Sequence, residues 1–521
     1  MHELVLRGGR VHDGLGGAAA AADVAISGGR VTAVGPDLGA ARRVVDVAGL
    51  DVAPGFVDAH AHSDLVPFAG PSPFKLLQGV TTEVAGNCGY SPAPLDGASA
   101  PEADAQIGEA LGARVLRAWT FAEYLAQLQA ARPVNHLAVM VGHNTLRLVA
   151  NGMDRELRPG ALDRMRALAE EAFAAGAAGL SSGLIYVPGA YGGTDELVAL
   201  ARVAHRYGVP YATHLRDEGD HLEAALDEAV EVARRARVRL QVSHCKAAGH
   251  RNHGKGAVLL ERLARARREG VDARGDQYPY DAGGTMLSAL LPTAAYEGGT
   301  QELVRRLQDA GELARLRAVA QDPAAPPGSG LWSSAAPGDV LVTAHRDRGT
   351  VGRTLAEIAD GEDPWVVLAR LLVADPAAMM VVRLMADADI RAIMADPLVG
   401  VGSDNGSPSG FEHPRTWGCF PHFLGTWVRD AAVVPWEEAV RKATSAVADQ
   451  FGLLDRGWLG AGAHADVTIF DRARIGHPAD YARPSARPTG IEWVLVGGEV
   501  AVERGEYTGL RTGRVLRPWT R

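Results

Sequence analysis

The chain is poor in cysteine and in long apolar runs. Its three cysteines, Cys88, Cys245 and Cys419, are too few for a disulfide framework. No apolar run reaches the ~20 residues that a bilayer-spanning helix needs. The first nine residues lack the basic region and apolar core of a signal peptide. These absences predict a cytoplasmic protein that does not enter a membrane.

Concentrated positive charge is also missing. The net charge of −9 is spread along the 521 residues, without the basic stripe that nucleic-acid binding requires. Lysine is rare, with only four among 53 basic residues. A composition that is 47% hydrophobic can bury a large core. The composition therefore favours a globular enzyme with a small-molecule substrate and no nucleic-acid partner.

The two ends of the chain share a pattern of short strands with Gly-Gly turns. Residues 4–12 and 24–34 each contain a strand, a glycine turn and a return strand, and residues 465–471 and 493–503 have a similar pattern. We predict that residues 1–54 and 451–521 form one small β-sandwich around an inserted domain. Two unrelated β appendages are the alternative, which the recurring Gly-Gly turns disfavour.

Residues 55–450 alternate strand-like segments with amphipathic helical ones. Counted from residue 55, eight strands follow one another with helices between many of them, which predicts a (β/α)₈ barrel. The connection from the seventh strand, ending near residue 278, to the eighth, beginning near 398, is far longer than usual. We expect residues 291–350 to form an insertion there. A lid over the barrel mouth is favoured over a purely structural excursion.

Side chains that bind metals stand at the ends of the predicted strands. Each of five strands ends in such a group: His60 and His62, Cys88, His214, His244, and Asp404. Residues two apart in a strand share a face, so both imidazoles of the first pair can point at one metal. Because the carboxyl ends of barrel strands form one mouth, this rhythm predicts a single metal site.

Zinc suits these side chains, because it binds cysteine sulfur and histidine nitrogen and keeps one position open in catalytic sites. Cys88, His214 and His244 can supply three ligands, while His60 and His62 complete that site or hold a second metal. Cys245 is expected on the face opposite His244, and Cys419 has no ligand neighbours, so both are predicted to be structural.

Asp404 is the candidate for proton transfer. A carboxylate at this strand end can take the proton from a metal-activated water and return it to a leaving nitrogen. The alternative is an Asx turn that ends the strand before Asn405 and Gly406. The histidines at the other strand ends make catalysis the better interpretation.

These motifs together resemble a known superfamily. The run from Pro54 to His62, both flanking β segments and Asp404 resemble the amidohydrolases. Within that superfamily the chain resembles the D-aminoacylases (N-acyl-D-amino-acid deacylases) over nearly its whole length. The motifs that carry this resemblance are Gly86-Asn-Cys-Gly, Ser181-Ser-Gly-Leu, Thr213-His-Leu-Arg, Ser243-His-Cys-Lys, Tyr278-Pro-Tyr and His413-Pro-Arg. The resemblance implies a zinc-dependent hydrolase that releases a carboxylic acid and a free D-amino acid.

The resemblance also implies roles for single residues. The fourth strand has no lysine and the third no glutamate, so Cys88 would bridge two metal positions. One zinc would be held tightly by Cys88, His214 and His244, and a second more weakly at the histidine pair. Arg415, Lys246 and Tyr278 would contact the substrate carboxylate, a task that suits a guanidinium fork and a compact ammonium.

The segment after Tyr278 bears on the substrate side chain. Residues 286–292, Met-Leu-Ser-Ala-Leu-Leu-Pro, contain no basic residue, which favours an apolar D-amino acid such as leucine, methionine or phenylalanine. The sequence specifies neither the acyl group nor the oligomeric state.

Two other functions fit parts of the pattern. A related hydrolase of cyclic amides, carbamates or dipeptides would use the same metal chemistry, but a neutral substrate would leave Arg415 and Lys246 unpaired. A noncatalytic, zinc-stabilised scaffold has no need of Asp404 beside the ligands.

Overall fold

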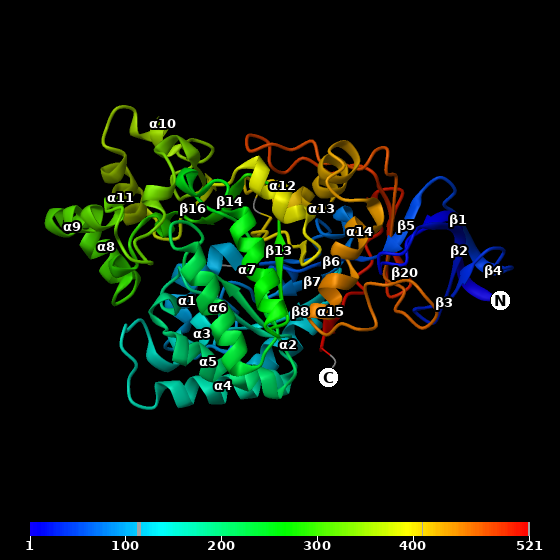
Figure 1. The fold of residues 1–521 in the computed structure, drawn as a ribbon, viewed down its shortest axis with the longest axis horizontal. Coiled ribbons are helices and arrows are strands. Elements are labelled where there is room, and N and C mark those ends of the chain that lie inside the picture. The colour runs from blue at the N-terminus through cyan, green and yellow to red at the C-terminus, as the bar shows by residue number, and fades with distance from the viewer. Residues whose placement is uncertain (112–115, 409, 519–521) are drawn as a thin grey trace.

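The computed structural model describes residues 1–111, 116–408 and 410–518. Three parts follow one another along the long axis of the molecule: a terminal β domain, a central barrel and a mainly helical excursion (Figure 1). Within the described residues, no helix combines the length and the apolar character needed to cross a membrane.

The predicted (β/α)₈ barrel is confirmed. Its strands pair in parallel along two sheets, and β8 and β9 together serve as the third strand, interrupted at Met140. The strands are β6 (Phe56–Asp58), β7 (Val80–Ala85), β8 (His136–Val139), β9 (Val141–Gly142), β10 (Leu180–Gly183), β11 (Tyr211–His214), β12 (Leu240–Val242), β13 (Ala273–Gln277) and β17 (Val399–Val401). A short strand near the carboxyl end, β22 (Val515–Leu516), lies parallel to β8.

Helices surround the barrel with one apolar face each. In α4 (Ala161–Ala175), for example, Met165, Ala169 and Ala172 are buried at helical spacing. The other helices between or after the barrel strands are α1 (Ala100–Leu111), α2 (Phe121–Ala130), α3 (His143–Asn151), α5 (Thr194–Arg206), α6 (Leu222–Ala236), α7 (Gly256–Arg268), α12 (Asp387–Ala395), α13 (Arg415–His422), α14 (Trp436–Lys442) and α15 (Ser445–Gln450).

The barrel closes between its first and last strands, β6 and β17. Backbone N–H groups of Ala59 and Asp404 donate to Val401 and His60 carbonyls at 3.1 and 2.7 Å. The buried Asp58 carboxylate accepts from the N–H groups of His60 and Ser403 at 3.1 and 2.8 Å.

A fully buried lysine neutralises that carboxylate. Lys75 Nζ lies 2.5 Å from Asp58 Oδ2, donates to Ser403 Oγ at 2.8 Å, and is 3.6 Å from the Glu83 carboxylate. Burial alone would lower the pKa of Lys75, but the two carboxylates raise it. Lys75 therefore stays charged and ties the seam together from inside the protein.

Both ends of the chain contribute to one terminal β domain, as predicted, but its nine strands form one continuous hydrogen-bonded sheet where a sandwich was expected. Its central contact is the antiparallel pair of β5 and β18. The strands are β1 (His2–Val11), β2 (Ala20–Ser27), β3 (Arg30–Gly35), β4 (Ala41–Asp46), β5 (Asp51–Pro54), β18 (Val467–Phe470), β19 (Ile491–Val496), β20 (Glu499–Glu503) and β21 (Glu506–Tyr507). Apolar side chains from both ends, including Leu6, Val24, Val467 and Leu495, form its own core.

The excursion between β13 and β17 is larger than the predicted interval of 291–350. Its antiparallel sheet places β16 (Met379–Arg383) between β14 (Ala282–Met286) and β15 (Val340–Ala344), so two of its strands lie outside that interval. The Gly-Gly pair inside β14 hides a strand from pattern analysis, because glycine is depleted in strands. Its helices are α8 (Thr300–Gln308), α9 (Ala310–Gln321), α10 (Leu355–Ala359) and α11 (Pro364–Ala374).

Replacing Lys75 by methionine should destabilise the fold strongly. The change leaves two carboxylates buried without their cation, which typically costs about 3–5 kcal/mol. Urea unfolding followed by circular dichroism measures the loss. Lys255→Met is the matched control, because Lys255 is partly exposed and its Nζ donates to the neutral Asn252 side chain at 2.6 Å. Equal unfolding midpoints for the two variants would show that Lys75 does not stabilise the contact between β6 and β17.

Candidate metal centre and active site

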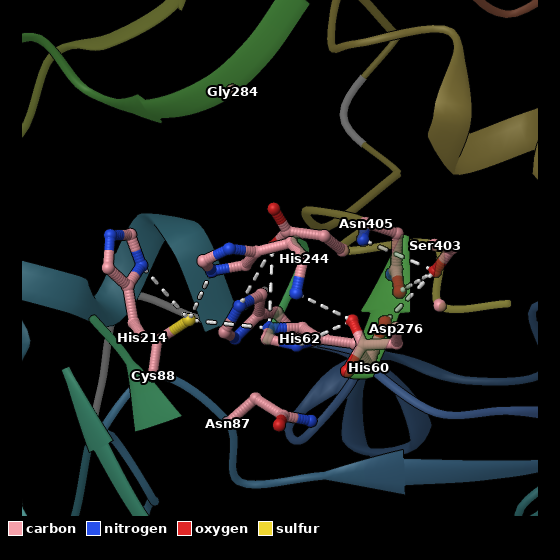
Figure 2. A network of polar contacts seen from close by, with 12 residues as sticks. His60, His62, Asn87, Cys88, His214, His244, Asp276, Gly284, Ser403 and Asn405 are labelled. Atoms are coloured by element: carbon pink, nitrogen blue, oxygen red, sulfur yellow. Dashed lines mark hydrogen bonds and ion pairs between the residues drawn. The ribbon is translucent and has the colours of Figure 1, made fainter. Parts of the chain in front are cut away.

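The structure brings all six predicted metal-site and catalytic residues to one mouth of the barrel. Figure 2 shows the four histidines gathered there around Cys88. Their candidate ligand atoms form two groups, each with all atoms within 4.8 Å of one another. One group is Cys88, His214 and His244; the other is His60, His62, Cys88 and Asp404. Cys88 belongs to both groups, the position that a bridging ligand occupies.

The Cys88 sulfur lies among three imidazoles. Sγ is 3.3 Å from His60 Nε2, 3.7 Å from His214 Nδ1 and 3.5 Å from His244 Nε2. All four side chains are buried. Burial raises the pKa of a thiol, but the surrounding histidines hold the pKa of Cys88 well below its usual value. A lowered pKa favours the thiolate, the form that binds metals.

Asp404 faces the histidine pair from the opposite side of the barrel seam. Its Oδ1 lies 3.2 Å from His62 Nε2 and 3.6 Å from His60 Nε2. Burial disfavours charge on His62, but Asp404 and Cys88 override it and raise the pKa of His62 to about 9. Burial would also raise the pKa of Asp404, yet Arg415 and the histidines hold it well below the ordinary value.

A tight loop after β7 presents Cys88. Ser181 on β10 clamps this loop: its Oγ donates to the Gly86 carbonyl at 2.5 Å and accepts from the Gly89 N–H at 3.1 Å. A Cβ atom at Gly89 would lie 2.0 Å from Asn144 Oδ1, and one at Gly183 would lie 2.0 Å from the Cys88 carbonyl. Serine and glycine in the Gly86-Asn-Cys-Gly and Ser181-Ser-Gly-Leu motifs are thus required by this close packing.

Three of the site residues have left-handed backbones. The φ angles are +52° at Cys88, +34° at His244 and +48° at Asp404. Non-glycine residues rarely adopt this conformation, which costs of order 1–3 kcal/mol and clusters at functional sites. Each of these residues lies two or three positions beyond the end of its strand, so the turn directs the side chain into the mouth.

Two carboxylates behind the histidines, the buried Asp276 and the partly buried Glu218, were missed by the sequence predictions. Asp276 Oδ1 lies 3.5 Å from His60 Nδ1 and accepts from the His244 N–H at 2.8 Å. Glu218 Oε1 lies 2.9 Å from His244 Nδ1. Burial opposes charge on Glu218, but Lys246 and the two histidines lower its pKa. The sequence signal for them was weak: Asp276 lies one residue before the end of its strand, and Glu218 follows His214 by four residues.

The three predicted substrate-binding residues converge on one ring. The Arg415 guanidinium lies 4.5 Å from the centre of the Tyr278 ring, and Lys246 Nζ lies 5.7 Å from it. All three side chains are buried. They are therefore one cluster beside Asp404, which Arg415 Nη1 contacts at 2.9 Å.

One sequence-based argument about this cluster was wrong. We expected a neutral substrate to leave Arg415 and Lys246 unpaired, but Arg415 pairs with Asp404, and Lys246 Nζ lies 2.7 Å from Glu218 Oε1. Each cation already has a carboxylate partner, so pairing alone does not select a charged substrate. Arg415 Nε can still recognise a substrate carboxylate, because it is a buried donor without a hydrogen-bond partner in the described parts of the chain.

An apolar cavity adjoins the metal centre. Tyr186 stands at the boundary, with its ring 5.1 Å from the His214 ring. Tyr90, Met286, Leu291 and Tyr296 also line the cavity, and none of the described lining residues is charged. Its walls combine barrel loops with the start of the excursion.

The other two cysteines lie outside both ligand groups. Cys245 is buried with its sulfur 3.5 Å from the Val242 carbonyl, and Cys419 is buried 3.8 Å from that of Gly402. Burial raises the pKa of both thiols. This placement agrees with their predicted structural role.

Comparison with known proteins shows which family the chain belongs to. A family model described as "Amidohydrolase family" matches residues 43–502. The D-aminoacylase of Alcaligenes xylosoxydans xylosoxydans is 36% identical over 99% of this chain and 97% of its own length. The N-acyl-D-glutamate deacylase of the same organism is 38% identical over 99% and 96%.

A solved structure agrees over the whole length. The N-acyl-D-glutamate deacylase of Bordetella bronchiseptica, complexed with zinc and a phosphonate inhibitor that mimics the tetrahedral intermediate, superposes with a TM-score of 0.84. It is 32% identical over 99% of both chains. With these matches, and with the histidine, cysteine and aspartate side chains gathered at the barrel mouth, the chain belongs to the amidohydrolase family, alongside its D-aminoacylase members.

Proposed function

We propose that this protein hydrolyses the amide bond of N-acyl-D-amino acids with apolar side chains, using zinc and giving a carboxylate and a free D-amino acid. The observation that carries the proposal is the shared cluster at the barrel mouth. There a thiolate, four imidazoles and Asp404 adjoin the Arg415–Tyr278–Lys246 cluster and an uncharged cavity.

The donor set fits zinc. Cys88, His214 and His244 offer one thiolate and two imidazoles, and their candidate ligand atoms all lie within 4.8 Å of one another. Zinc favours this mixture of sulfur and nitrogen. We assign the tight site to these three residues and a weaker second site to His60 and His62 with Cys88. Bound zinc would polarise the amide carbonyl and acidify a water.

Asp404 is suited to move the proton. Its low pKa keeps it ionised at neutral pH, so it can accept a proton at Oδ1, the oxygen that faces His62. Once protonated, it is a strong acid and returns that proton readily to the leaving nitrogen. Arg415 holds the other oxygen, Oδ2, and thereby fixes the orientation of the carboxylate.

Arg415 also has a donor to offer the substrate. Its Nη2 donates to the Gly284 carbonyl at 3.0 Å, which leaves Nε free for an α-carboxylate. A carboxylate anchored here, with Tyr278 and Lys246 beside it, fixes which face of the α-carbon is presented. The side chain of the D enantiomer would then enter the cavity lined by Leu291 and Met286, whereas the L side chain would meet the barrel wall.

The cytoplasmic location and the absence of a nucleic-acid partner, both expected from composition, remain part of this proposal.

A substrate panel tests the function directly. We expect zinc-loaded enzyme to release amine from N-acetyl-D-leucine, N-acetyl-D-methionine and N-acetyl-D-phenylalanine, and to be far slower with N-acetyl-D-glutamate and with the L enantiomers. Dialysis against a chelator should abolish turnover, and added zinc should restore it. Preferred hydrolysis of a cyclic amide, carbamate or dipeptide would replace the proposal by that alternative.

Asp404→Asn should lower kcat by ~10²–10⁴-fold, the range for loss of a general acid or base. Its zinc content should stay close to that of the wild type, because the tight site does not include Asp404. Steady-state kinetics and metal analysis on the same preparation measure both. A near-normal kcat would show that Asp404 does not transfer the proton and serves only in the turn that ends its strand.

Arg415→Met should lower kcat/KM for N-acyl-D-amino acids by roughly ten- to more than a hundredfold, since a charged hydrogen-bond partner contributes about 1.5–3 kcal/mol. Loss of the cation should also raise the pKa of Asp404 and move the acid limb of the pH–kcat profile to higher pH. Arg383→Met is the control, because Arg383 is exposed and stacks on Tyr481, away from the metal centre.

The methyl ester or amide of the substrate separates the two roles of Arg415. If the wild type hydrolyses these neutral analogues as well as the free acid, Arg415 does not recognise a carboxylate.

A further inference from the structure

Glu218 lies behind the metal centre, on the side of the histidines that faces away from Cys88. It belongs to the loop after β11, and its side chain is 11% exposed. Oε2 lies 3.5 Å from His214 Nε2, and Oε1 lies 2.9 Å from His244 Nδ1. One carboxylate therefore faces both histidines of the proposed tight site, with a different oxygen for each.

The two histidines present opposite nitrogens to the centre. His214 turns Nδ1 toward Cys88, whereas His244 turns Nε2 toward it. A neutral imidazole carries one proton, and a nitrogen that binds a metal must be the unprotonated one. His214 must therefore carry its proton on Nε2 and His244 on Nδ1. These are the two nitrogens that Glu218 faces, and an ionised carboxylate only accepts.

Lys246 is the third group on Glu218. Its Nζ lies 2.7 Å from Glu218 Oε1 and 2.7 Å from His244 Nδ1, and it also belongs to the cluster around Tyr278. Since an ammonium only donates, Lys246 cannot accept the His244 proton, and Glu218 Oε1 is the acceptor that both groups share. Glu218 thus connects the proposed zinc ligands with Lys246, one of the proposed substrate-binding cations. His214 Nε2 is buried without a hydrogen-bond partner in the described chain, and the Glu218 oxygen 3.5 Å away is the carboxylate that faces it.

We propose that Glu218 is a positioning residue that sets opposite tautomers in His214 and His244 and so prepares both to bind zinc. It acts through the two imidazoles and does not touch the reacting atoms. The inference rests on the proposed zinc site. Its rival is that Glu218 serves only as the counterion of Lys246.

The test measures zinc affinity without substrate. Glu218→Gln keeps the size of the side chain but leaves one acceptor oxygen, while its amide nitrogen opposes the proton of the second histidine. Competition with a chromophoric chelator should show 10- to 100-fold weaker zinc binding, the usual effect of losing such a partner. Cys88→Ala, which removes the shared ligand, gives the lower limit of affinity.

A matched control exists in the same barrel. Glu196, a buried carboxylate, likewise lies beside a histidine and a cation, with Oε1 at 2.6 Å from His143 Nε2 and 3.6 Å from Arg147 Nε. Glu196→Gln makes the same chemical change away from the metal centre and should leave zinc affinity unchanged. Equal affinities for wild type, Glu218→Gln and Glu196→Gln would overturn the inference.

The double variant Glu218→Gln/Lys246→Met separates the rival. If Glu218 only neutralises Lys246, removing both charges should restore zinc affinity, and that result would overturn the proposal. We expect the zinc affinity to stay low, because the double variant still lacks the carboxylate that fixes the tautomers of His214 and His244.

A measurement on the unaltered protein covers the case in which the variants do not fold. A crystal structure of the zinc-loaded wild type should show the metal on His214 Nδ1 and His244 Nε2, with Glu218 in reach of the other nitrogen of each. A Glu218 side chain turned away from both would overturn the inference. Wild type that binds no zinc would overturn the proposed metal site together with it, whereas normal zinc binding by Glu218→Gln would overturn this inference alone.

Discussion

The ion pair between Asp58 and Lys75 is the interaction on which the active mouth depends most. It lies inside the barrel wall where β6 meets β17, with both side chains fully buried. Asp58 also accepts backbone N–H groups from His60 and Ser403, the residues at which the two strands deliver the histidine pair and Asp404. A buried pair of this kind is costly to break, because either partner alone is an uncompensated charge. The geometry of the catalytic half of the site is therefore set by a contact that never meets the substrate.

The other half of the site has an independent support. Cys88 is held by a glycine loop clamped from Ser181, while His214 and His244 have Glu218 behind them. The two halves share the Cys88 sulfur and Asp276, whose Oδ1 faces His60 Nδ1 and accepts from the His244 N–H. Each pair of histidines otherwise faces its own carboxylate, Glu218 for His214 and His244 and Asp404 for His60 and His62, which would let the two proposed metal positions differ in affinity.

Much of this could be read from the sequence because barrel strands end at a common mouth. The order of strands alone predicts that His60, Cys88, His214, His244 and Asp404 meet. The scarcity of lysine was also informative, and more widely than expected: Lys75, Lys246 and Lys442 are all buried at 6% exposure or less. A chain that otherwise uses arginine has kept lysine mainly where a compact cation must fit inside.

The parts that sequence could not predict depend on side-chain direction in loops. Glu218 lies in a run of acidic residues, Asp217 to Asp220, and spacing does not say which of them turns inward. The pairing of Arg415 with Asp404 could not be predicted from the sequence either, because it joins a strand end to the start of α13. The excursion was underestimated for a related reason, since its strand β14 pairs with a segment about 100 residues later.

The pairing of β5 with β18 has a consequence for how the chain reaches its fold. β5 lies between β1 and β18, and about 400 residues of barrel and excursion separate it from β18 in the sequence. At ribosomal rates of about 5–20 residues per second, β18 is synthesised roughly 20–80 s after β5, and the edge of β5 stays unpaired during this time. An unpaired apolar edge invites association with other chains. The nascent protein is thus most vulnerable to aggregation through its amino-terminal strands, long before the barrel that they support is complete.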